Sequence, residues 1–264
     1  MQKLSSETKI DQLSIQLSEY EQLLNVCRQE NDAFINIAAH DLKAPVRKLA
    51  VLIDRLLLKA KKNANDDLSI YTEKIVSTLA EMDAVVERLS AYAAVEINNI
   101  DFSETSLTEL VKNVITEHSQ LIKSSNAEII VEGLPNLKIN KPQIKTVFKE
   151  LLDNSLKFIR ENDRPKIKIK SSNLTLKEKE IYNLANKSVY HKIEFIDNGI
   201  GIREDIVEKI FQPFFRFYGK ADFAGSGMGL AIIRKIMKNH QGMIYAMPNE
   251  YEGVTMIIIF PETS

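Results

Sequence analysis

The first forty residues carry a hydrophobic pattern that is typical of a long helix with one apolar seam. Asn31 occupies the seam position before Phe34, so one polar residue stands in register with the apolar ones. This pattern predicts a two-stranded coiled coil in which Asn31 helps to fix the register, and the alternative is a lone amphipathic helix packed on a domain. The apolar residues recur at alternating steps of three and four, at Ile10, Leu13, Leu17, Tyr20, Leu24, Cys27, Phe34 and Ala38.

The helical pattern continues to about Lys61, and a second helix is predicted beyond it. A helix unbroken from about Thr8 would be roughly 80 Å long at 1.5 Å per residue. The polar residues 62–67 then interrupt the pattern, and a second helix is expected from about Leu68 to Val95. These two helices form a hairpin, and two copies of the hairpin are expected to make a four-helix bundle.

From Ile97 onward, short β-type runs alternate with helical patterns. This alternation predicts an α/β sandwich with helices on one face of the sheet. The boundary between the two halves is expected near Asn98 and Asn99, and residues 173–191 are expected to be an extra polar segment between two strands. The expected strands are residues 128–131, 166–170, 192–196, 243–246 and 254–260, and the expected helices are residues 107–123, 142–159, 204–210 and 226–239.

Composition and charge narrow the class of protein. A chain of 264 residues that is 44% hydrophobic suits one large or two modest domains. The net charge of −1 argues against a nucleic-acid-binding protein. Because no run of 18 apolar residues and no signal-peptide pattern is present, we expect no membrane span and a cytoplasmic setting. The single cysteine, Cys27, excludes an internal disulfide framework and is interpreted as a packing residue, with a cross-strand disulfide as the alternative.

Six of the nine glycines fall into one stretch of about thirty residues, and two clusters of them suggest a nucleotide pocket. The first cluster, DNGIG, starts at Asp197, whose carboxylate can accept the exocyclic amine of adenine; an ordinary tight turn is the alternative. The second cluster, GSGMG, starts at Gly225 and leads into an apolar helix, whose free N–H groups favour phosphates. Neither a Walker A loop nor the dinucleotide fingerprint fits, because Ile232 stands where the latter needs glycine.

Two further segments offer side chains for such a pocket. Glu150, Asn154 and Lys157 share one face of an expected helix, where an amide oxygen suits Mg²⁺ and a lysine can meet phosphate. A solvated polar helix face is the alternative. The phenylalanine-rich residues 211–219 can anchor a mobile lid, with Arg216 and Lys220 in reach of phosphate, or they can belong to the core.

One histidine in the long helix is the candidate nucleophile. His40 precedes Asp41 and stands five residues before Pro45, which is a plausible bend point of the helix. Imidazole is a competent nucleophile at neutral pH, and an adjacent acid can orient the ring or take its proton. The sequence HDLK is similar to the catalytic loop of Ser/Thr/Tyr kinases, but no Arg follows His40, Val46 stands where Asn is required, and no DFG follows.

The order and spacing of these motifs resemble those of a sensor histidine kinase of two-component signalling. The histidine box, the hairpin, the asparagine box, DNGIG, the phenylalanine-rich segment and GSGMGL follow one another from Phe34 to Phe260. The resemblance implies a coiled-coil signalling helix over residues 1–30 and a dimerisation and histidine phosphotransfer domain over residues 31–97. It further implies a catalytic ATP-binding domain over residues 98–264 with the Bergerat fold, an α/β sandwich also found in gyrase, Hsp90 and MutL.

The same resemblance assigns roles to single residues. His40 is expected to be the phosphoacceptor and Asp41 the acidic neighbour that assists it. Asn154 is expected to bind Mg²⁺, Lys157 to lie near the phosphates and Asp197 to read adenine. The other expected nucleotide-binding residues comprise glycines beside the base, lid-anchoring aromatics with their arginine, and the motif that closes on the triphosphate: Gly199, Gly201, Phe214, Phe215, Arg216, Gly225, Gly227, Gly229 and Leu230.

Two positions depart from the family pattern. Many members carry an Asn where this chain has Glu150, and the related ATPases often place a general-base Glu there. Glu150 is therefore expected either to activate a nucleophile or to help hold the metal ion. Four residues after His40, many bifunctional members have Thr or Asn, whereas this chain has Ala44, so phosphatase activity through that residue is not expected.

The sequence thus predicts a homodimeric, ATP-dependent protein-histidine kinase that phosphorylates His40 and passes the phosphoryl group to an aspartate of a response regulator. Because Met1 lies nearly within the coil and no sensor domain is visible, we expect either a truncated piece of a longer sensor or a kinase driven by a separate input protein. The alternatives are a non-catalytic nucleotide-binding adaptor and, because of Glu150, a hydrolysing ATPase. The other histidines are isolated, so no zinc site is expected.

Overall fold

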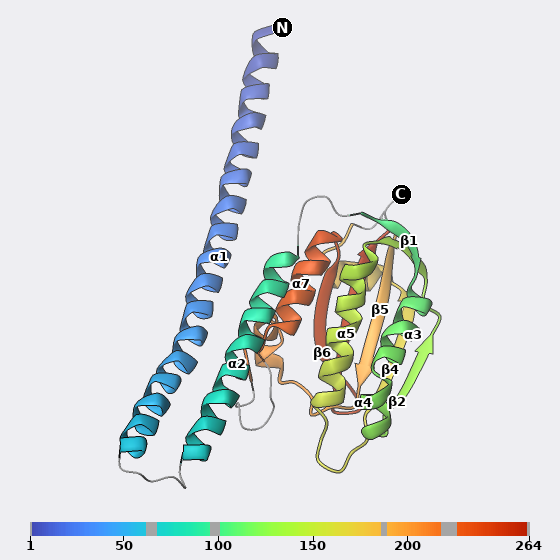
Figure 1. Cartoon of the computed structure of the whole chain (residues 1–264). Coiled ribbons are helices and arrows are strands. Elements are labelled where there is room, and N and C mark those ends of the chain that lie inside the picture. The colour runs from blue at the N-terminus through green and yellow to red at the C-terminus, as the bar shows by residue number, and fades with distance from the viewer. Residues whose placement is uncertain (1, 62–67, 96–100, 186–188, 218–225, 263–264) are drawn as a thin grey trace. The chain divides into compact units, whose positions relative to one another are not determined.

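The computed structural model describes residues 2–61, 68–95, 101–185, 189–217 and 226–262 (Figure 1). The chain divides into two compact units, Met1–Val85 and Val86–Ser264, and each is described by itself. The expected boundary near Asn98 and the polar residues 62–67 lie outside the described residues. Among the described residues, no helix combines the length and the apolar character that a membrane crossing requires.

The first unit consists of two helices. Helix α1 (Gln2–Lys61) is one element that includes Pro45, and helix α2 (Leu68–Ala94) follows it, so the two predicted helices are confirmed. Lys48 and Glu81 form an ion pair of 3.5 Å between these helices.

Apolar side chains of the predicted seam are open to solvent in the single chain. Leu17, Tyr20 and Leu24 expose 61%, 66% and 69% of their surface. A row of exposed apolar side chains on one helix is characteristic of a surface that another helix covers.

The second unit is built on a mixed five-stranded sheet. Its spatial order is β2 (Glu128–Glu132), β4 (Lys166–Asn173), β5 (Tyr190–Asp197), β7 (Val254–Pro261) and β6 (Met243–Pro248). Strands β2 and β4 are parallel, and the other neighbouring pairs are antiparallel. All five predicted strands are therefore confirmed. A separate antiparallel pair, β1 (Ser103–Ser106) with β3 (Asn136–Ile139), was not predicted, because these strands have only four residues each and a largely polar sequence.

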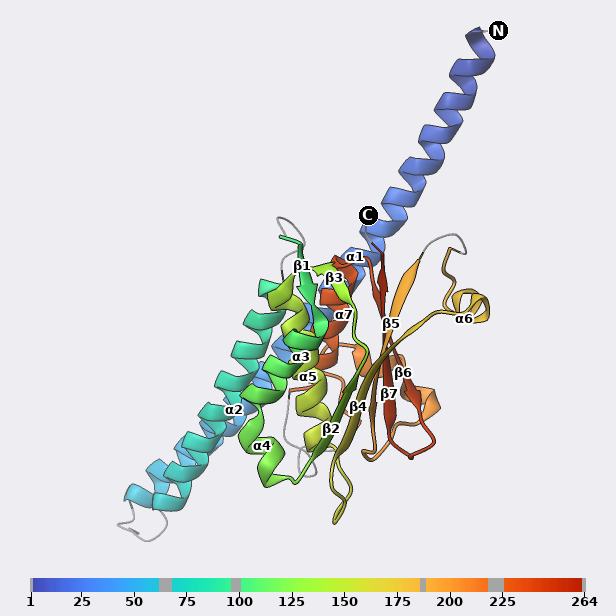
Figure 2. The ribbon, with the colours of Figure 1, turned by 90° about the vertical axis from the view of Figure 1, so that its right-hand side faces the viewer.

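Helices cover one face of this sheet. Figure 2 shows α3 (Leu107–Glu117), α5 (Lys141–Lys157) and α7 (Gly229–Asn239) on the same side of the strands. The side chains of Ser106 and Asn140 cap the first two of these helices by accepting hydrogen bonds from backbone N–H groups three residues on. The α/β sandwich predicted from the alternating pattern is thus confirmed.

Two helix predictions need correction. The helix expected over residues 107–123 is divided into α3 and α4 (Ser119–Ser124) at His118, whose Nδ1 bonds the carbonyl of Val114 at 2.8 Å and whose Nε2 bonds Asp153 at 3.0 Å. The helix expected over residues 204–210 consists instead of two single 3₁₀ turns, η2 (Glu204–Ile206) and η3 (Lys209–Phe211).

The core lies between the sheet and the three helices. Along β4, lysines alternate with the buried Ile167 and Ile169, so the strand turns its apolar side chains toward the helices. The neighbouring strands continue this face with Phe195 on β5 and Ile258 on β7, and the helices meet it with side chains such as Phe148 on α5. This packing holds the ends of β5, α5 and α7 in a fixed arrangement, which positions the site described below.

The extra segment between β4 and β5 covers part of the other face of the sheet. Its short helix α6 (Leu176–Ile181) begins with a capping box, in which Thr175 and Glu178 bond each other's backbone N–H groups. Figure 2 shows α6 on the side of the strands opposite α3, α5 and α7. Lys192 on β5 bonds Glu178 at 2.5 Å, and the rings of Tyr182 and Tyr245 stack at 4.6 Å. This segment is polar as predicted, and it is also a structural cover.

The contacts of Glu178 make the cover sensitive to acid. The hydrogen bond from Lys192 and those from Thr175 lower the pKa of Glu178 from 4.5 to about 2. Because the folded pKa lies below the unfolded value, the contribution of Glu178 to stability is fully present above a pH of about 4.5 and is lost as the pH falls toward 2.

We expect Glu178→Gln to lower the free energy of unfolding by about 1 kcal/mol at pH 7, because the pair with Lys192 is partly in contact with solvent. Urea denaturation at pH 7 and at pH 2.5 measures the effect, which should shrink at the lower pH because Glu178 of the unfolded wild type takes up its proton below a pH of about 4.5. Glu180→Gln, an exposed change on the same helix, serves as the control. Equal losses for both variants at pH 7 would contradict the assignment.

Candidate functional site

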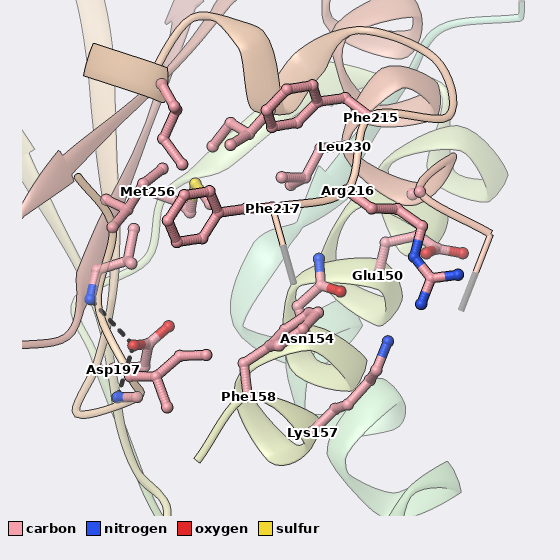
Figure 3. Close-up of a pocket in the computed structure, with 18 of the residues that line it drawn as sticks. Glu150, Asn154, Lys157, Phe158, Asp197, Phe215, Arg216, Phe217, Leu230 and Met256 are labelled. Atoms are coloured by element: carbon pink, nitrogen blue, oxygen red, sulfur yellow. Dashed lines mark hydrogen bonds between the residues drawn. The ribbon is translucent and has the colours of Figure 1, made fainter. Parts of the chain in front are cut away.

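A large pocket opens in the second unit where the ends of several elements meet (Figure 3). Its volume is about 1120 Å³ with the open mouth included, which is ample for a nucleotide. One wall comes from α5, a second from the loop after β5, and the others from residues 215–217, the start of α7 and the strand β7. The four sequence motifs, on α5, after β5, at residues 215–217 and at the start of α7, therefore meet in one hollow.

Asp197 stands at the end of β5 with its carboxylate held by three donors. Its Oδ1 accepts hydrogen bonds from the backbone N–H groups of Gly199 at 2.9 Å and Val254 at 3.0 Å. Its Oδ2 accepts one from the buried hydroxyl of Ser155 at 2.8 Å, and the side-chain amide of Asn249 donates to its backbone carbonyl at 2.8 Å. A carboxylate oriented by donors in this way presents remaining lone pairs to an amine group of a ligand.

The first glycine cluster lets the backbone pass tightly beneath this carboxylate. Gly201 has a φ of 78°, in the left-handed region that favours glycine. A Cβ atom at this position would also collide with the carbonyl oxygen of Glu252, in the turn between β6 and β7. A Cβ atom on Gly199 would lie 2.5 Å from the carbonyl oxygen of Phe158. DNGIG is therefore more than an ordinary turn, because it is clamped between α5 and the β6–β7 turn.

The second glycine cluster packs on the phenylalanine-rich segment. Gly227 has a φ of 71°, and a Cβ atom there would lie 2.7 Å from the carbonyl oxygen of Phe215 and 2.9 Å from the carbonyl carbon of Phe214. Phe214 itself has a φ of 63°, which is uncommon for a bulky residue. Its ring is buried, as is that of Phe211, whereas Phe215 and Phe217 line the pocket. The segment thus supplies both core and pocket wall.

Three polar side chains of α5 reach the pocket from one face of the helix, as predicted. Figure 3 shows Glu150, Asn154 and Lys157 directed into the hollow, with Asp197 on the far side. Burial lowers the pKa of Lys157, and the positive charges of Arg216 and Arg88 lower it further. The side of the pocket away from Asp197 therefore concentrates positive charge, which suits an anionic group.

Glu150 is buried at the base of this cationic side. Its carboxylate is ion-paired with Arg88 and lies so close to Gly229 that a Cβ atom there would collide with it. Gly229 is the first residue of α7, and Leu230 beside it also lines the pocket. A negative charge at a helix N-terminus is electrostatically favourable.

The remaining predicted site residues lie elsewhere or outside the described part. His40 and Asp41 belong to the first unit, on α1, where the His40 side chain is 79% exposed and its Nδ1 lies 3.4 Å from Oδ1 of Asp41. Phe214 lies behind the pocket wall. Gly225 and Lys220 fall among the residues that the structure does not describe.

Several residues of the site escaped the sequence analysis. Ser155 follows Asn154 directly, and its hydroxyl supports Asp197 although Ser155 does not itself line the pocket. Arg88 gave no signal, because it lies on a different helix more than sixty residues upstream of Glu150. The apolar wall follows no motif either, apart from Ile200 in DNGIG; its other residues are Phe158, Ile202, Ile206, Ile210, Val254 and Met256.

The histidines of the second unit have structural partners. His118 joins α3 to α5 through Asp153, and its two ring nitrogens both face acceptors. His240 at the end of α7 accepts from the backbone N–H of Asn140 at 3.1 Å, and burial lowers its pKa. Among the described residues, no group of three or more His, Cys, Asp and Glu side chains is placed to hold a metal ion.

A mixed sheet with helices on one face, and a pocket with a fixed carboxylate at one end and cations at the other, define an ATP-binding domain of the Bergerat type. Residues 139–264 match the family of histidine kinase-, DNA gyrase B-, and HSP90-like ATPases. The chain is also similar to a phytochrome-like protein and to a regulatory histidine kinase.

Phytochrome-like protein Cph1 from Synechocystis sp. is 29% identical over 228 residues, which cover 86% of this chain and 29% of that protein. Methanogenesis regulatory histidine kinase FilI from Methanothrix harundinacea is 25% identical over 233 residues, which cover 88% and 25%. The chain thus spans less than a third of the length of these relatives. The structure of histidine kinase ThkA in complex with response regulator protein TrrA shares the fold, with a TM-score of 0.58 at 23% identity over 88% of this chain and 61% of that one.

We expect Ser155→Ala to weaken the binding of ADP by about three- to tenfold, because Oδ2 of Asp197 loses the donor that orients it. Titration calorimetry measures the affinity, and the triphosphate analogue adenylyl imidodiphosphate should lose the same factor, since the change acts at the base. Thr146→Ala is the matched control, because its hydroxyl bonds within the same helix, to Pro142. Unchanged affinity in the Ser155 variant would show that Asp197 does not need this hydroxyl.

Proposed function

We propose that this chain is the kinase core of a sensor histidine kinase, which binds Mg-ATP in the pocket, phosphorylates His40 and transfers the phosphoryl group to an aspartate of a response regulator. The observation that carries the proposal is the fixed carboxylate of Asp197 facing a cationic pocket side. The exposed His40 beside Asp41 supplies a suitable acceptor. ThkA, a structural relative, forms a complex with a response regulator, which supports this partner.

The pocket residues hold the nucleotide in this proposal. Asp197 accepts the adenine amine, while the apolar wall with Ile200 and Met256 contacts the ring. Lys157 and Arg216 neutralise the phosphates. The glycines of the second cluster let the backbone approach the triphosphate.

Oxygen ligands for Mg²⁺ are present on α5. The amide oxygen of Asn154 and the carboxylate of Glu150 are hard ligands, and Mg²⁺ on a nucleotide typically needs only one or two protein ligands beside the phosphates. These residues therefore fit the ion, which when bound supplies charge neutralisation for phosphoryl transfer.

His40 is the nucleophile in this proposal. Nδ1 lies 3.4 Å from Oδ1 of Asp41, and in the tautomer that carries its proton on Nδ1, Nε2 is the nucleophilic nitrogen. Nε2 forms a bond to the γ-phosphorus as the bond to the β–γ bridging oxygen breaks, and ADP leaves with that electron pair. Asp41 stabilises the positive charge that develops on the imidazole ring.

We further propose that the chain works as a homodimer in which two hairpins form a four-helix bundle. The exposed apolar side chains of the seam, among them Leu17 and Leu24, are the surface that the second copy would cover. Because the chain spans less than a third of its relatives, an upstream sensor domain or protein is part of the proposal.

A hydrolysing ATPase is the second candidate, because Glu150 lies in the pocket at the position of a general base. Its ion pair with Arg88 disfavours this role, since the guanidinium occupies a carboxylate oxygen that a general base would offer to water. The two candidates differ in their product: one leaves phosphohistidine, the other inorganic phosphate.

We expect His40→Gln to abolish acid-labile labelling by γ-labelled ATP, more than a hundredfold, while ADP affinity stays within twofold of the wild type. Gel autoradiography and calorimetry make the two measurements. His191→Gln, on β5 and distant from the pocket lining, serves as the control that keeps its label.

Two results would contradict the proposal. Label that survives in His40→Gln would sink the phosphoacceptor assignment. Inorganic phosphate released by that variant at the wild-type rate, without labelling of the wild type, would identify the ATPase instead.

A further inference from the structure

Arg88 enters the pocket from a part of the chain that none of the nucleotide motifs includes. It lies on α2, whose residues from Val86 onward belong to the second unit. Its guanidinium pairs with the buried carboxylate of Glu150 and forms part of the pocket lining. The Arg88 side chain is 39% exposed, so it lies at the mouth of the pocket with access to a ligand.

The charges around Arg88 are unbalanced toward the positive. Arg88, Arg216 and Lys157 approach one another closely enough for the two guanidinium groups to lower the pKa of the lysine, while Glu150 raises it. Cations gathered in this way repel each other, and a polyanion inserted among them would relieve that repulsion. A guanidinium is also the side chain best shaped to bind phosphate oxygens in pairs.

Glu150 occupies the place where an anionic group is most favourable. Its carboxylate lies against the first residue of α7, Gly229, and is held there by Arg88. The same carboxylate is one of two oxygen ligands that fit Mg²⁺. If Glu150 turns to the ion, Arg88 loses its partner and keeps its charge, and the nearest new anion is the triphosphate.

A second contact holds the end of α2 independently of Arg88. The ammonium of Lys235, on α7, donates to the backbone carbonyl of Tyr92 at 2.7 Å and lies 4.6 Å above the Tyr92 ring. Tyr92 follows Arg88 by one helical turn, so both residues lie on the same face of α2. Arg88 can therefore change partner by rotating its side chain, without α2 leaving its position.

We propose that Arg88 is a phosphate-binding residue contributed by α2, and that it exchanges Glu150 for the terminal phosphates when Mg-ATP binds. The inference rests on the proposed function of the pocket and adds to it a residue outside the ATP-binding family segment, residues 139–264. In this proposal, a residue of α2 contacts the terminal phosphates directly, so α2 makes different contacts with and without them.

The test is titration calorimetry of the full chain with Mg²⁺ and three probes: adenosine, ADP and adenylyl imidodiphosphate. We expect Arg88→Gln to weaken the triphosphate analogue about tenfold, ADP by a smaller factor and adenosine less than twofold. Arg88→Lys should recover part of the loss, because the charge is kept and the paired donors are not. Arg164→Gln, which breaks a surface pair with Glu128 and changes no residue of the pocket lining, should bind all three probes like the wild type.

Other outcomes are distinguishable. Arg88→Gln could bind the triphosphate analogue as tightly as the wild type, or more tightly, with an unchanged melting temperature. Arg88 would then only neutralise Glu150, and the role of Arg88 would be overturned while the proposed function of the pocket would stand. A uniform loss for all three probes, adenosine included, would mean a structural role and would overturn it as well. Failure of the wild type to bind any adenine compound would overturn the proposed function together with it.

Discussion

The carboxylate of Asp197 ties together the elements that form the pocket. Its oxygens accept from the loop that follows β5, from the first residue of β7 and from the hydroxyl of Ser155 on α5. Since the backbone carbonyl of Asp197 also receives the Asn249 amide, the β6–β7 turn is fixed to the same point. A single residue thus sets the mutual position of three strands and a helix, and the tight glycine packing around Gly201 depends on that position.

The opposite end of the pocket follows a different principle. There the side chains of Arg88, Arg216 and Lys157 lie near the buried carboxylate of Glu150. A bound polyanion would lower the electrostatic repulsion among these cations. The base end is therefore preorganised by hydrogen bonds, whereas the phosphate end is prepared by a concentration of positive charge. This division suits a ligand with a neutral ring at one end and several negative charges at the other.

Much of this arrangement was predictable from the sequence, because strands with alternating lysine and isoleucine, as in β4, and glycine clusters after a strand give strong local signals. The predictions failed where local signals are weak or compete. The helix expected over residues 107–123 ends early at His118, because its ring bonds a backbone carbonyl and a distant aspartate. At residues 204–211 the apolar spacing extends over too few residues to distinguish two 3₁₀ turns from a short α-helix. Arg88 was missed because its role depends on tertiary contact with Glu150, which no spacing reveals.

The cover formed around α6 allows the interior strand β7 to carry apolar side chains on both of its faces. Ile257 and Ile259 lie opposite Glu194 and Lys192 of β5, on the face that Glu178 and Tyr182 approach, and both are buried although they point away from the main core. The strand therefore reads as an unbroken apolar run from Met256 to Phe260. A shortened protein lacking the segment between β4 and β5 would expose Ile257 and Ile259 to water, while the alternate residues of the run stayed in the core, and the uncovered pair would favour self-association.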